Sequence, residues 1–246
     1  MAEPLTLFHV SDLHFGAEDR AALDWFAAEV ERCRPAWVIC TGDLTMRARR
    51  REFAAAAEWL GALAAPVSVE PGNHDMPYFN PLERFAQPYA RYGVLREAVH
   101  REPVFDQVTV VPLRTVAPAQ WRLNWSKGRV SDAALDVTLA HVDAAQAIPL
   151  RLVACHHPLV EADTEATAST RGGKAALARL AAAGVDAVLS GHVHDAFDLV
   201  VEAGGRPIRL IGAGTLSERV RATPPSFNVL TVAGGALDVA VRRLGD

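Results

Sequence analysis

The sequence predicts an α/β fold that forms a single domain over residues 1–246. Short apolar runs alternate with segments of helical periodicity three times in the first third, and strand-like runs return in the final third. No internal repeat, low-complexity tract or long linker separates these parts. Half of the 246 residues are apolar, so the chain is long enough to bury a sizeable core as one domain.

Composition and charge limit the classes of function. The net charge is −4 and the pI is about 6.1, so we expect no nucleic-acid partner. The three cysteines form no CxxC pair, which argues against a disulfide framework or a zinc knuckle. The N-terminus lacks the features of a signal peptide, and the longest apolar stretch, 54–69, is interrupted by Glu58 and Pro66. We expect a cytoplasmic protein without a transmembrane segment, and its oligomeric state stays open between monomer and dimer.

The first predicted strand, 5–10, is followed by two side chains of metal-ligand type. Asp12 and His14 are two residues apart, so in an extended segment both would face the same side. Taken alone, the pair is equally typical of a solvated strand end. The next segment, 19–33, has apolar residues at helical spacing, and Pro35 ends that predicted helix.

The second predicted strand, 36–41, is continuously apolar, and Asp43 follows it. A carboxylate in this position lies at the carboxyl edge of an open α/β sheet, where such sheets bind ligands. A basic segment, 46–51, and a predicted helix over 52–63 come next. The arginines of the basic segment, Arg47 among them, form either a solvated helix start or a rim that attracts the phosphate of a substrate.

The third predicted strand, 66–69, leads into the stretch Pro71-Gly72-Asn73-His74-Asp75, around which the other motifs are arranged. Glycine allows the chain to turn, Asn73 offers a neutral oxygen ligand, and His74 and Asp75 can form an orienting pair. For this stretch alone, a polar turn without function is the alternative.

The middle of the chain is less regular. We expect a helix over 80–91 and an antiparallel hairpin that pairs 103–106 with 108–112. One side of the helix carries residues of core type: Leu82, Phe85, Tyr89 and Tyr92. Ser131 then caps a predicted helix that runs to about residue 145.

The loop over 114–129 mixes aromatic, amide and basic side chains, which suits a phosphorylated ligand that bears a ring. The candidates for substrate contact are Trp121, Asn124 and Trp125, with Arg47 from the basic segment. A surface loop anchored by its two tryptophans is the alternative.

In the final third, two predicted strands again end in imidazoles. Strand 150–155 leads to His156-His157-Pro158, and strand 185–189 leads to His192 and His194. A helix over 172–183 lies between them. Four more strands are expected, over 198–201, 208–211, 227–232 and 238–242.

Five strand ends thus deliver seven candidate metal ligands. They are Asp12, His14, Asp43, Asn73, His156, His192 and His194. Imidazole and carboxylate in this mixture accept Mn, Fe or Zn, and a carboxylate such as Asp43 can bridge two ions.

The motifs Asp-x-His, Gly-Asp, Gly-Asn-His-Asp, His-x-Pro and Gly-His-x-His resemble those of the calcineurin-like metallophosphoesterase superfamily. The resemblance implies a four-layer sandwich, two mixed β-sheets flanked by helices, with two divalent metal ions at the carboxyl edge of the sheets. Mn or Fe is the expected metal, and Zn is the alternative. The implied ligands are Asp12, His14 and His194 for one ion, Asn73, His156 and His192 for the other, and Asp43 for both. His157 would either support a ligand without touching the metal or simply pack in the interior.

The resemblance also implies the enzyme class, a metal-dependent phosphoric diester hydrolase. Two dications lower the pKa of a shared water, so the expected reaction is attack of the bridging hydroxide on phosphorus. His74 would stabilise or protonate the leaving oxygen, and Asp75 would hold the tautomer of His74.

Within the superfamily, the chain is most similar to bacterial class III cyclic-nucleotide phosphodiesterases, which pair Gly-Asn-His-Asp with His-His-Pro. The expected partner is a small phosphodiester, with 3',5'-cyclic AMP as the candidate. The alternative is a phospholipid or nucleotide-sugar phosphodiesterase or pyrophosphohydrolase, which an apolar groove formed by 76–92 would favour. A non-catalytic scaffold is a third hypothesis, against which stands the presence of every ligand and of His74.

Overall fold

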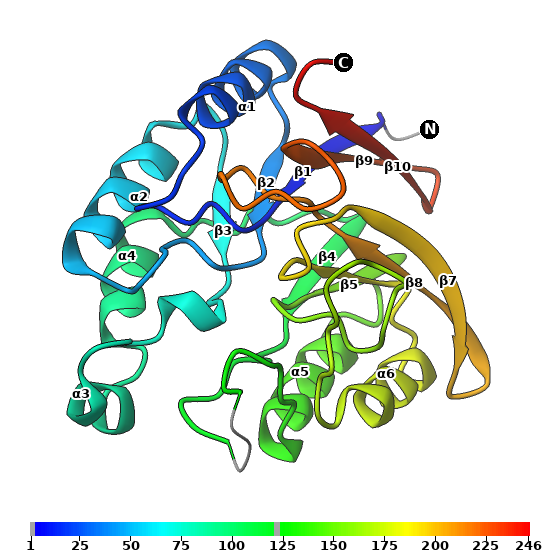
Figure 1. The fold of residues 1–246 in the computed structure, drawn as a ribbon. Helices are drawn as coiled ribbons and strands as arrows, with labels where there is room; N and C mark the ends of the chain where they lie inside the picture. The colour runs from blue at the N-terminus through cyan, green and yellow to red at the C-terminus, as the bar shows by residue number, and fades with distance from the viewer. Residues whose placement is uncertain (1–2, 121–123) are drawn as a thin grey trace.

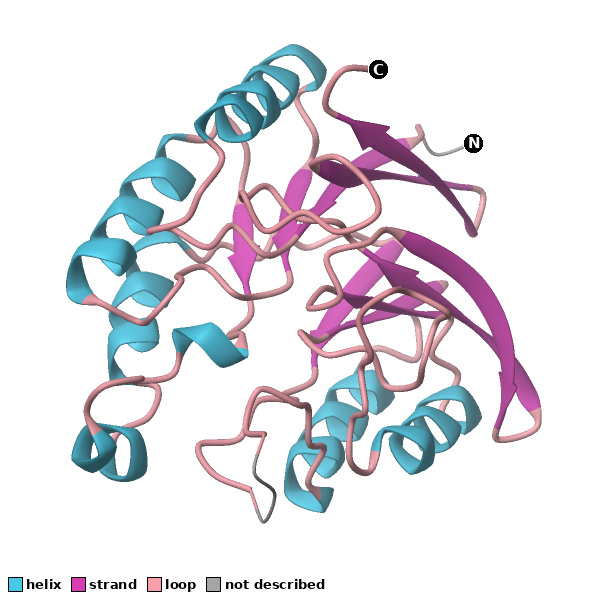
Figure 2. Ribbon diagram, in the orientation of Figure 1, coloured by secondary structure: helices cyan, strands magenta, loops and turns pink. Residues whose placement is uncertain are grey.

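The computed structural model describes residues 3–120 and 124–246. Two five-stranded β-sheets pack face to face, and helices cover the outer side of each sheet (Figures 1 and 2). The predicted four-layer α/β sandwich is therefore confirmed. None of the helices in these residues is long and apolar enough to cross a membrane.

The first sheet has the strand order β10-β9-β1-β2-β3. Its strands are β1 (Leu5–Val10), β2 (Trp37–Cys40), β3 (Val67–Val69), β9 (Ser226–Ala233) and β10 (Ala236–Arg243). The first three are parallel because α1 (Arg20–Cys33) and α2 (Arg50–Ala62) cross over between them. The strands β9 and β10 complete the sheet as an antiparallel pair beside β1.

The second sheet has the strand order β4-β5-β6-β8-β7. Its strands are β4 (Val108–Pro112), β5 (Leu150–Ala154), β6 (Ala187–Ser190), β7 (Phe197–Ala203) and β8 (Arg206–Gly212). The crossover helices α5 (Asp132–Ala144) and α6 (Gly173–Ala182) make β4, β5 and β6 parallel, and β8 is parallel to β6 because it returns from β7 in a hairpin. Only β7, at the edge, runs antiparallel.

Three apolar layers hold the sandwich together. Residues such as Leu7 and Ile39 of the first sheet meet Leu152 and Leu189 of the second in the central layer. The outer layers lie under α1, α2 and α4 (Ala90–Val99) on one side and under α5 and α6 on the other. Strands of both sheets are buried on both faces, and this is why their sequences are continuously apolar instead of alternating between apolar and polar residues.

The predicted helix over 80–91 is wrong in its extent. Pro88 has no N–H to donate, and the chain forms two helices on either side of it, α3 (Pro81–Ala86) and α4 (Ala90–Val99). Only the second packs its aromatic side on the body, where Tyr92 is buried. Leu82 and Phe85 of α3 point into solvent instead of the core.

The predicted antiparallel hairpin around residue 107 is also wrong. Strand β4 pairs in parallel with β5, and residues 103–106 form no strand. Phe105 packs on Trp37 with its ring centre 6.4 Å away, whereas Val104 is exposed. The apolar side chain of Phe105 therefore packs at the end of the central layer and does not belong to a local strand pair.

Candidate metal centre

All seven predicted ligands lie together at the carboxyl edge, where the two sheets meet. They follow the ends of β1, β2, β3, β5 and β6. Contacts across the sheets close the site: Nδ1 of His156 donates to the carbonyl oxygen of Thr41, and the backbone N–H of His192 donates to Oδ2 of Asp12, both at 2.8 Å. The ligand set is thus assembled from both halves of the chain.

The first group of ligands converges on one point. Oδ1 of Asp12 lies 3.0 Å from Nε2 of His194 and 3.5 Å from Nε2 of His14. The two imidazole nitrogens are themselves 3.2 Å apart. Three electron-pair donors in this arrangement can surround a single cation.

The second group lies on the other side of Asp43. Oδ1 of Asn73 is 3.2 Å from Nε2 of His156, and the rings of His156 and His192 are centred 5.2 Å apart. Oδ2 of Asp43 lies 3.4 Å from Nε2 of His156 and 3.8 Å from Nε2 of His14. One carboxylate oxygen therefore faces both groups, which is the position of a bridging ligand.

Hydrogen bonds orient the candidate metal-binding atoms. The N–H of His74 donates to Oδ1 of Asp43 at 2.8 Å, which leaves Oδ2 turned toward the histidines. Nδ1 of His156 and of His194 donates to a backbone carbonyl, so Nε2 is the ring nitrogen that faces a carboxylate oxygen and can hold either a proton or a metal ion. A nitrogen lone pair in contact with a carboxylate oxygen is unfavourable unless a proton or a metal ion lies between the two atoms. The donor set fits a metal ion at each group.

Charge in the site favours a cation. Burial raises the pKa of Asp43, but attraction to His156 and His74 outweighs it and holds the pKa well below its usual range. Burial lowers the pKa of His156, whereas the Asp43 carboxylate raises it more strongly, to about 9. A metal ion that bound Nε2 of His156 would have to displace this proton.

The ligand backbone departs from the extended form that the sequence suggested. Five ligands have φ between 47° and 72°: Asp12, His14, Asp43, His192 and His194. Left-handed backbone costs a residue other than glycine roughly 1–2 kcal/mol. Tight bends after the strands, not the alternation of an extended strand, therefore bring ligands two residues apart to one point.

Close packing of two loops keeps Asp43 in place. A Cβ atom on Gly72 would lie 2.0 Å from Oδ1 of Asp43 and 2.1 Å from its backbone nitrogen. Only glycine leaves room for the loop that carries Asn73 to lie against the loop that carries Asp43.

The predicted pairing of Asp75 with His74 is wrong. Nδ1 of His74 donates to the carbonyl oxygen of Met46 at 2.7 Å, and that carbonyl holds the tautomer. The two residues are neighbours in the 3₁₀ turn η1 (Asn73–Asp75), which turns their side chains in different directions.

Asp75 instead joins the two loops. Its carboxylate accepts from the N–H groups of Leu44, Thr45 and Gly72 and from the hydroxyl of Thr45, at 2.8–3.1 Å. Through these bonds Asp75 fixes the position of Asp43 relative to the turn that holds Asn73 and His74.

Arg219 is the site residue that the sequence did not reveal. Its Nη1 lies 2.9 Å from Nε2 of His74 and 3.5 Å from Nε2 of His14, and its carbonyl oxygen accepts from Nδ1 of His194. No motif marks it. The usable signal was topological, because β8 is parallel to β6 and the loop after it must begin at the same edge.

A cleft of about 640 Å³ opens over the ligands. Asn73, His74 and Arg219 form its inner end, next to the two donor groups. The two walls are lined by Tyr78, Pro81, Arg84 and Phe85 on one side and by Asn124, Trp125 and Ser126 on the other. The rings of Phe85 and Trp125 meet edge to face across the cleft, with centres 6.1 Å apart.

The predicted substrate contacts divide into three cases. Asn124 and Trp125 line the cleft. Arg47 lies beside it, in a hollow of about 260 Å³ that also contacts His74 and Tyr78. Trp121 lies outside the described residues.

His157 supports the cleft wall. Nε2 of its ring donates to the carbonyl oxygen of Ser126 at 2.8 Å, and its Nδ1 accepts from the hydroxyl of Thr115 at 3.0 Å. Both ring nitrogens are therefore used by protein groups, in agreement with the supporting role expected for this residue.

Comparison with known proteins shows the class. A family model described as calcineurin-like phosphoesterase matches residues 5–196. This match covers more than half of the chain, so it defines the class of the protein. The chain belongs to the calcineurin-like phosphoesterase family.

A curated relative and two solved structures are similar to the chain. The glycerophosphodiester phosphodiesterase GpdQ of Enterobacter lignolyticus is 32% identical over 94 residues, 32% of this chain and 34% of that protein, so the match spans about a third of the relative. A dimetal phosphatase from Danio rerio has a TM-score of 0.70 at 16% identity and covers 98% and 97% of the two chains. Purple acid phosphatase PPD1 from yellow lupin has a TM-score of 0.65 at 14% identity, with 100% and 52% covered. The two structures show the fold alone.

Proposed function

We propose that the protein is a phosphodiesterase with two divalent ions that hydrolyses a small phosphodiester. One ion would be held by Asp12, His14 and His194, the other by Asn73, His156 and His192, and Asp43 would contact both. The single observation that supports this most is that Oδ2 of Asp43 faces both donor groups at the inner end of the cleft. Mn or Fe suits the mixed nitrogen and oxygen ligands, and Zn would also be accepted.

Two ions bound there would supply a hydroxide nucleophile near neutral pH and would neutralise charge on the phosphoryl oxygens. The chain supplies the rest. The guanidinium of Arg219 is placed to bind a phosphoryl oxygen, and a guanidinium is the side chain best matched to that group. When Arg219 turns to the phosphate, Nε2 of His74 is released.

His74 would then serve the leaving group. The carbonyl oxygen of Met46 keeps the proton of Nδ1, so Nε2 is the ring atom that can carry a second proton to the leaving oxygen. This atom belongs to the inner end of the cleft, beside Arg219. Asp75 would contribute by holding Asp43 and the His74 turn in register.

For the substrate, 3',5'-cyclic AMP is our first candidate. A planar base would pack against Trp125 or Phe85, whose rings contact each other in the cleft, and the amide of Asn124 is available for polar contacts. The second candidate is a glycerophosphodiester or phospholipid-type diester. It is favoured by the apolar wall of Tyr78, Pro81 and Phe85 beside the ligands, and by the activity named for the curated relative.

The experiment compares turnover of four compounds by protein reconstituted with Mn. These are cyclic AMP, glycerophosphocholine, bis-p-nitrophenyl phosphate and the monoester p-nitrophenyl phosphate. Asp43→Ala serves as the blank. We expect the diesters to be cleaved faster than the monoester, with no turnover by the blank. Faster cleavage of the monoester, or equal activity of the blank, would overturn the proposal.

A further inference from the structure

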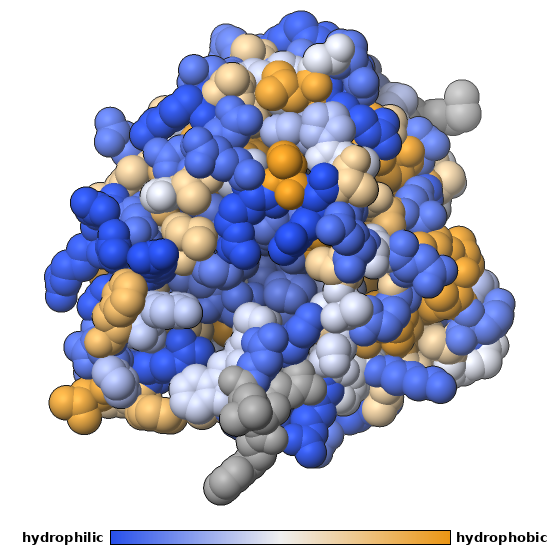
Figure 3. All heavy atoms as spheres, viewed as in Figure 1, coloured by the Kyte–Doolittle hydropathy of each residue, from blue (hydrophilic) through white to orange (hydrophobic). Residues whose placement is uncertain are grey.

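The helix α3 projects at one corner of the molecule and exposes apolar side chains there (Figures 1 and 3). The exposed fraction is 64% for Tyr78, 63% for Phe79, 83% for Leu82, 60% for Phe85 and 38% for Trp125. These five are half of the ten large apolar side chains that are exposed in the described residues, and they include every aromatic of that set. Exposure is therefore concentrated here, and we name these five residues the α3 surface.

Arginines are interleaved with the α3 surface. The guanidinium carbons of Arg47 and Arg49 lie 6.0 and 5.6 Å from the ring centre of Phe79, and that of Arg84 lies 5.3 Å from the ring centre of Trp125. Arg84 donates to the carbonyl oxygens of Pro118 and Pro77, which are neutral, so its charge is not cancelled. The chain as a whole has a net charge of −4, whereas this corner carries positive charge.

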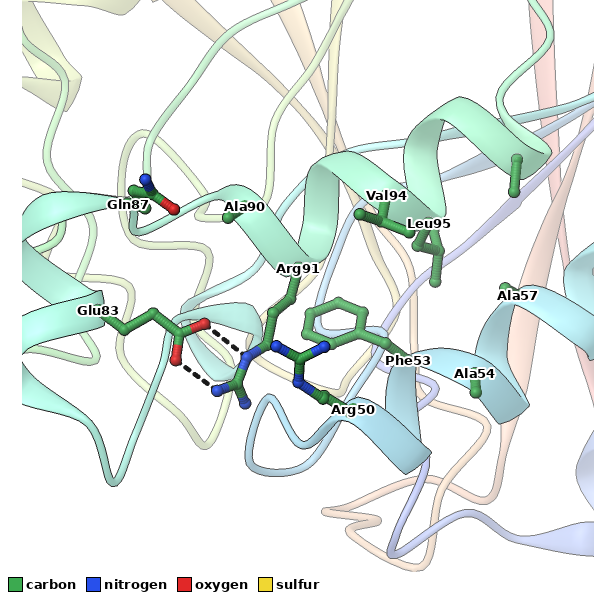
Figure 4. A pocket seen from close by; sticks show the side chains of 11 residues that line it. Arg50, Phe53, Ala54, Ala57, Glu83, Gln87, Ala90, Arg91, Val94 and Leu95 are labelled. Carbon is green, nitrogen blue, oxygen red and sulfur yellow. Dashed lines mark hydrogen bonds and ion pairs between the residues drawn. The ribbon is translucent and has the colours of Figure 1, made fainter.

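The α3 surface is held in a fixed position. Arg91 of α4 forms a two-fold ion pair with Glu83 of α3 and donates to the carbonyl oxygen of Ala48 at 2.7 Å. Figure 4 shows this pair at the end of a hollow between α2 and α4. The only carboxylate of α3 is thus turned inward and paired, and it does not weaken the positive charge of the exposed side.

The α3 surface is continuous with the substrate cleft. Tyr78 and Phe85 belong to both, and the inner end of the same cleft is formed by Asn73, His74 and Arg219. Anything that covers the α3 surface therefore lies at the cleft entrance.

We propose that the α3 surface docks on an anionic lipid bilayer. Aromatic side chains favour the boundary between headgroups and acyl chains, and apolar groups such as Leu82 gain by burial below it. The flanking Arg47 and Arg84 match the negative headgroups, and Arg49 lies beside them with its Nε 3.7 Å from the Glu52 carboxylate. A bilayer fits better than a protein partner, because the exposed aromatic side chains are interleaved with cations, which is the combination that an anionic headgroup layer accommodates. The docking goes beyond the proposed hydrolysis and does not depend on it.

The experiment is flotation of the whole protein with lipid vesicles, which needs neither metal nor turnover. We expect binding to phosphatidylcholine vesicles that contain phosphatidylglycerol, weaker binding without it, and release by added salt. Phe79→Ser and Leu82→Ser should each weaken binding on the order of tenfold, because each removes one inserted side chain. Val200→Ser on β7 is the matched control, since Val200 is 64% exposed but lies outside the α3 surface.

Two results would overturn the proposal. One is failure to bind vesicles that contain phosphatidylglycerol, or equal binding by the α3 variants and the control. The other is a solution dimer of the wild type that Leu82→Ser converts to a monomer, together with no vesicle binding. The α3 surface would then belong to contact between two copies of the chain.

Discussion

The side chain of Arg219 lies 2.9 Å from Nε2 of His74, while the backbone carbonyl of the same residue accepts the Nδ1 proton of His194. A single residue of the loop after β8 thus contacts a proposed metal ligand through its backbone and the proposed leaving-group acid through its side chain. Because the two contacts use different atoms, a substitution can remove one and leave the other in place.

Arg219→Ala should weaken binding of phosphate without loss of metal. A hydrogen bond to a charged group contributes about 1.5–3 kcal/mol, so the inhibition constant of inorganic phosphate should rise roughly 10- to 150-fold. Arg219→Lys should recover part of this affinity. Metal content, measured on the same samples, should not change because the contact to His194 is made by the backbone. An unchanged inhibition constant would remove Arg219 from phosphate binding.

His74→Ala should keep both ions but lose much of kcat. General acid catalysis contributes typically 10²- to 10⁴-fold, and the loss should be largest for esters with poor leaving groups. The measurement is the dependence of kcat on leaving-group pKa across a series of aryl and alkyl diesters. A loss of equal size for activated and unactivated esters would count against the acid role.

Gly72→Ala should damage the metal site. The added methyl group would lie 2.0 Å from Oδ1 of Asp43, so the two loops must separate. We expect metal affinity to fall about 10- to 100-fold, as for other changes that misplace a ligand. Gly93→Ala is the control, because a Cβ there meets nothing within 4 Å and should stabilise α4 by about 0.5–1 kcal/mol. Calorimetric titration with Mn would show the contrast, and equal affinity of the two variants would refute it.

Stability in the presence of chelator should fall in acid because of His9. Burial lowers the pKa of His9 to about 3, from 6.5 for an exposed histidine. Between these values the unfolded chain binds a proton that the folded chain excludes, so His9 stabilises the fold fully above about pH 6.5 and less as the pH falls.

The check is a comparison of urea unfolding for wild type and His9→Gln from pH 7 to pH 4. The wild type should lose more free energy of unfolding than the variant over this range, by an amount on the order of a few kcal/mol. If the free energy of unfolding fell equally with pH in the wild type and in His9→Gln, His9 would not be the cause of the loss of stability in acid.

The candidate metal ligands could be selected from the sequence because each follows a predicted strand, and the fold brings these residues together. Asp43 comes after an apolar run that is buried on both faces, and His192 and His194 after another, so topology alone places them at one edge. The α/β class was predictable from the alternation of strands and helices, whereas the four layers were expected only from the resemblance of the motifs to a known family. The geometry of the bends could not be predicted. Left-handed φ values at residues such as Asp12 are imposed by tertiary contacts, and the local sequence pattern does not indicate them.

The errors have specific causes. Asp75 and His74 are adjacent in sequence, but the 3₁₀ turn sends the carboxylate back to its own backbone donors. Leu82 and Phe85 have the spacing of a core helix, yet Pro88 separates them from the helix that packs. Arg219 is one arginine among many in the sequence, and only the fold brings it to His74.

The most direct test is electron paramagnetic resonance of the protein titrated with Mn(II), combined with metal analysis. If Asp43 contacts two ions, the wild type should bind two per chain and give the spectrum of a magnetically coupled pair. Asp43→Ala should lose the coupling along with phosphodiester turnover. A single uncoupled Mn per chain in an active wild type would contradict the proposed centre.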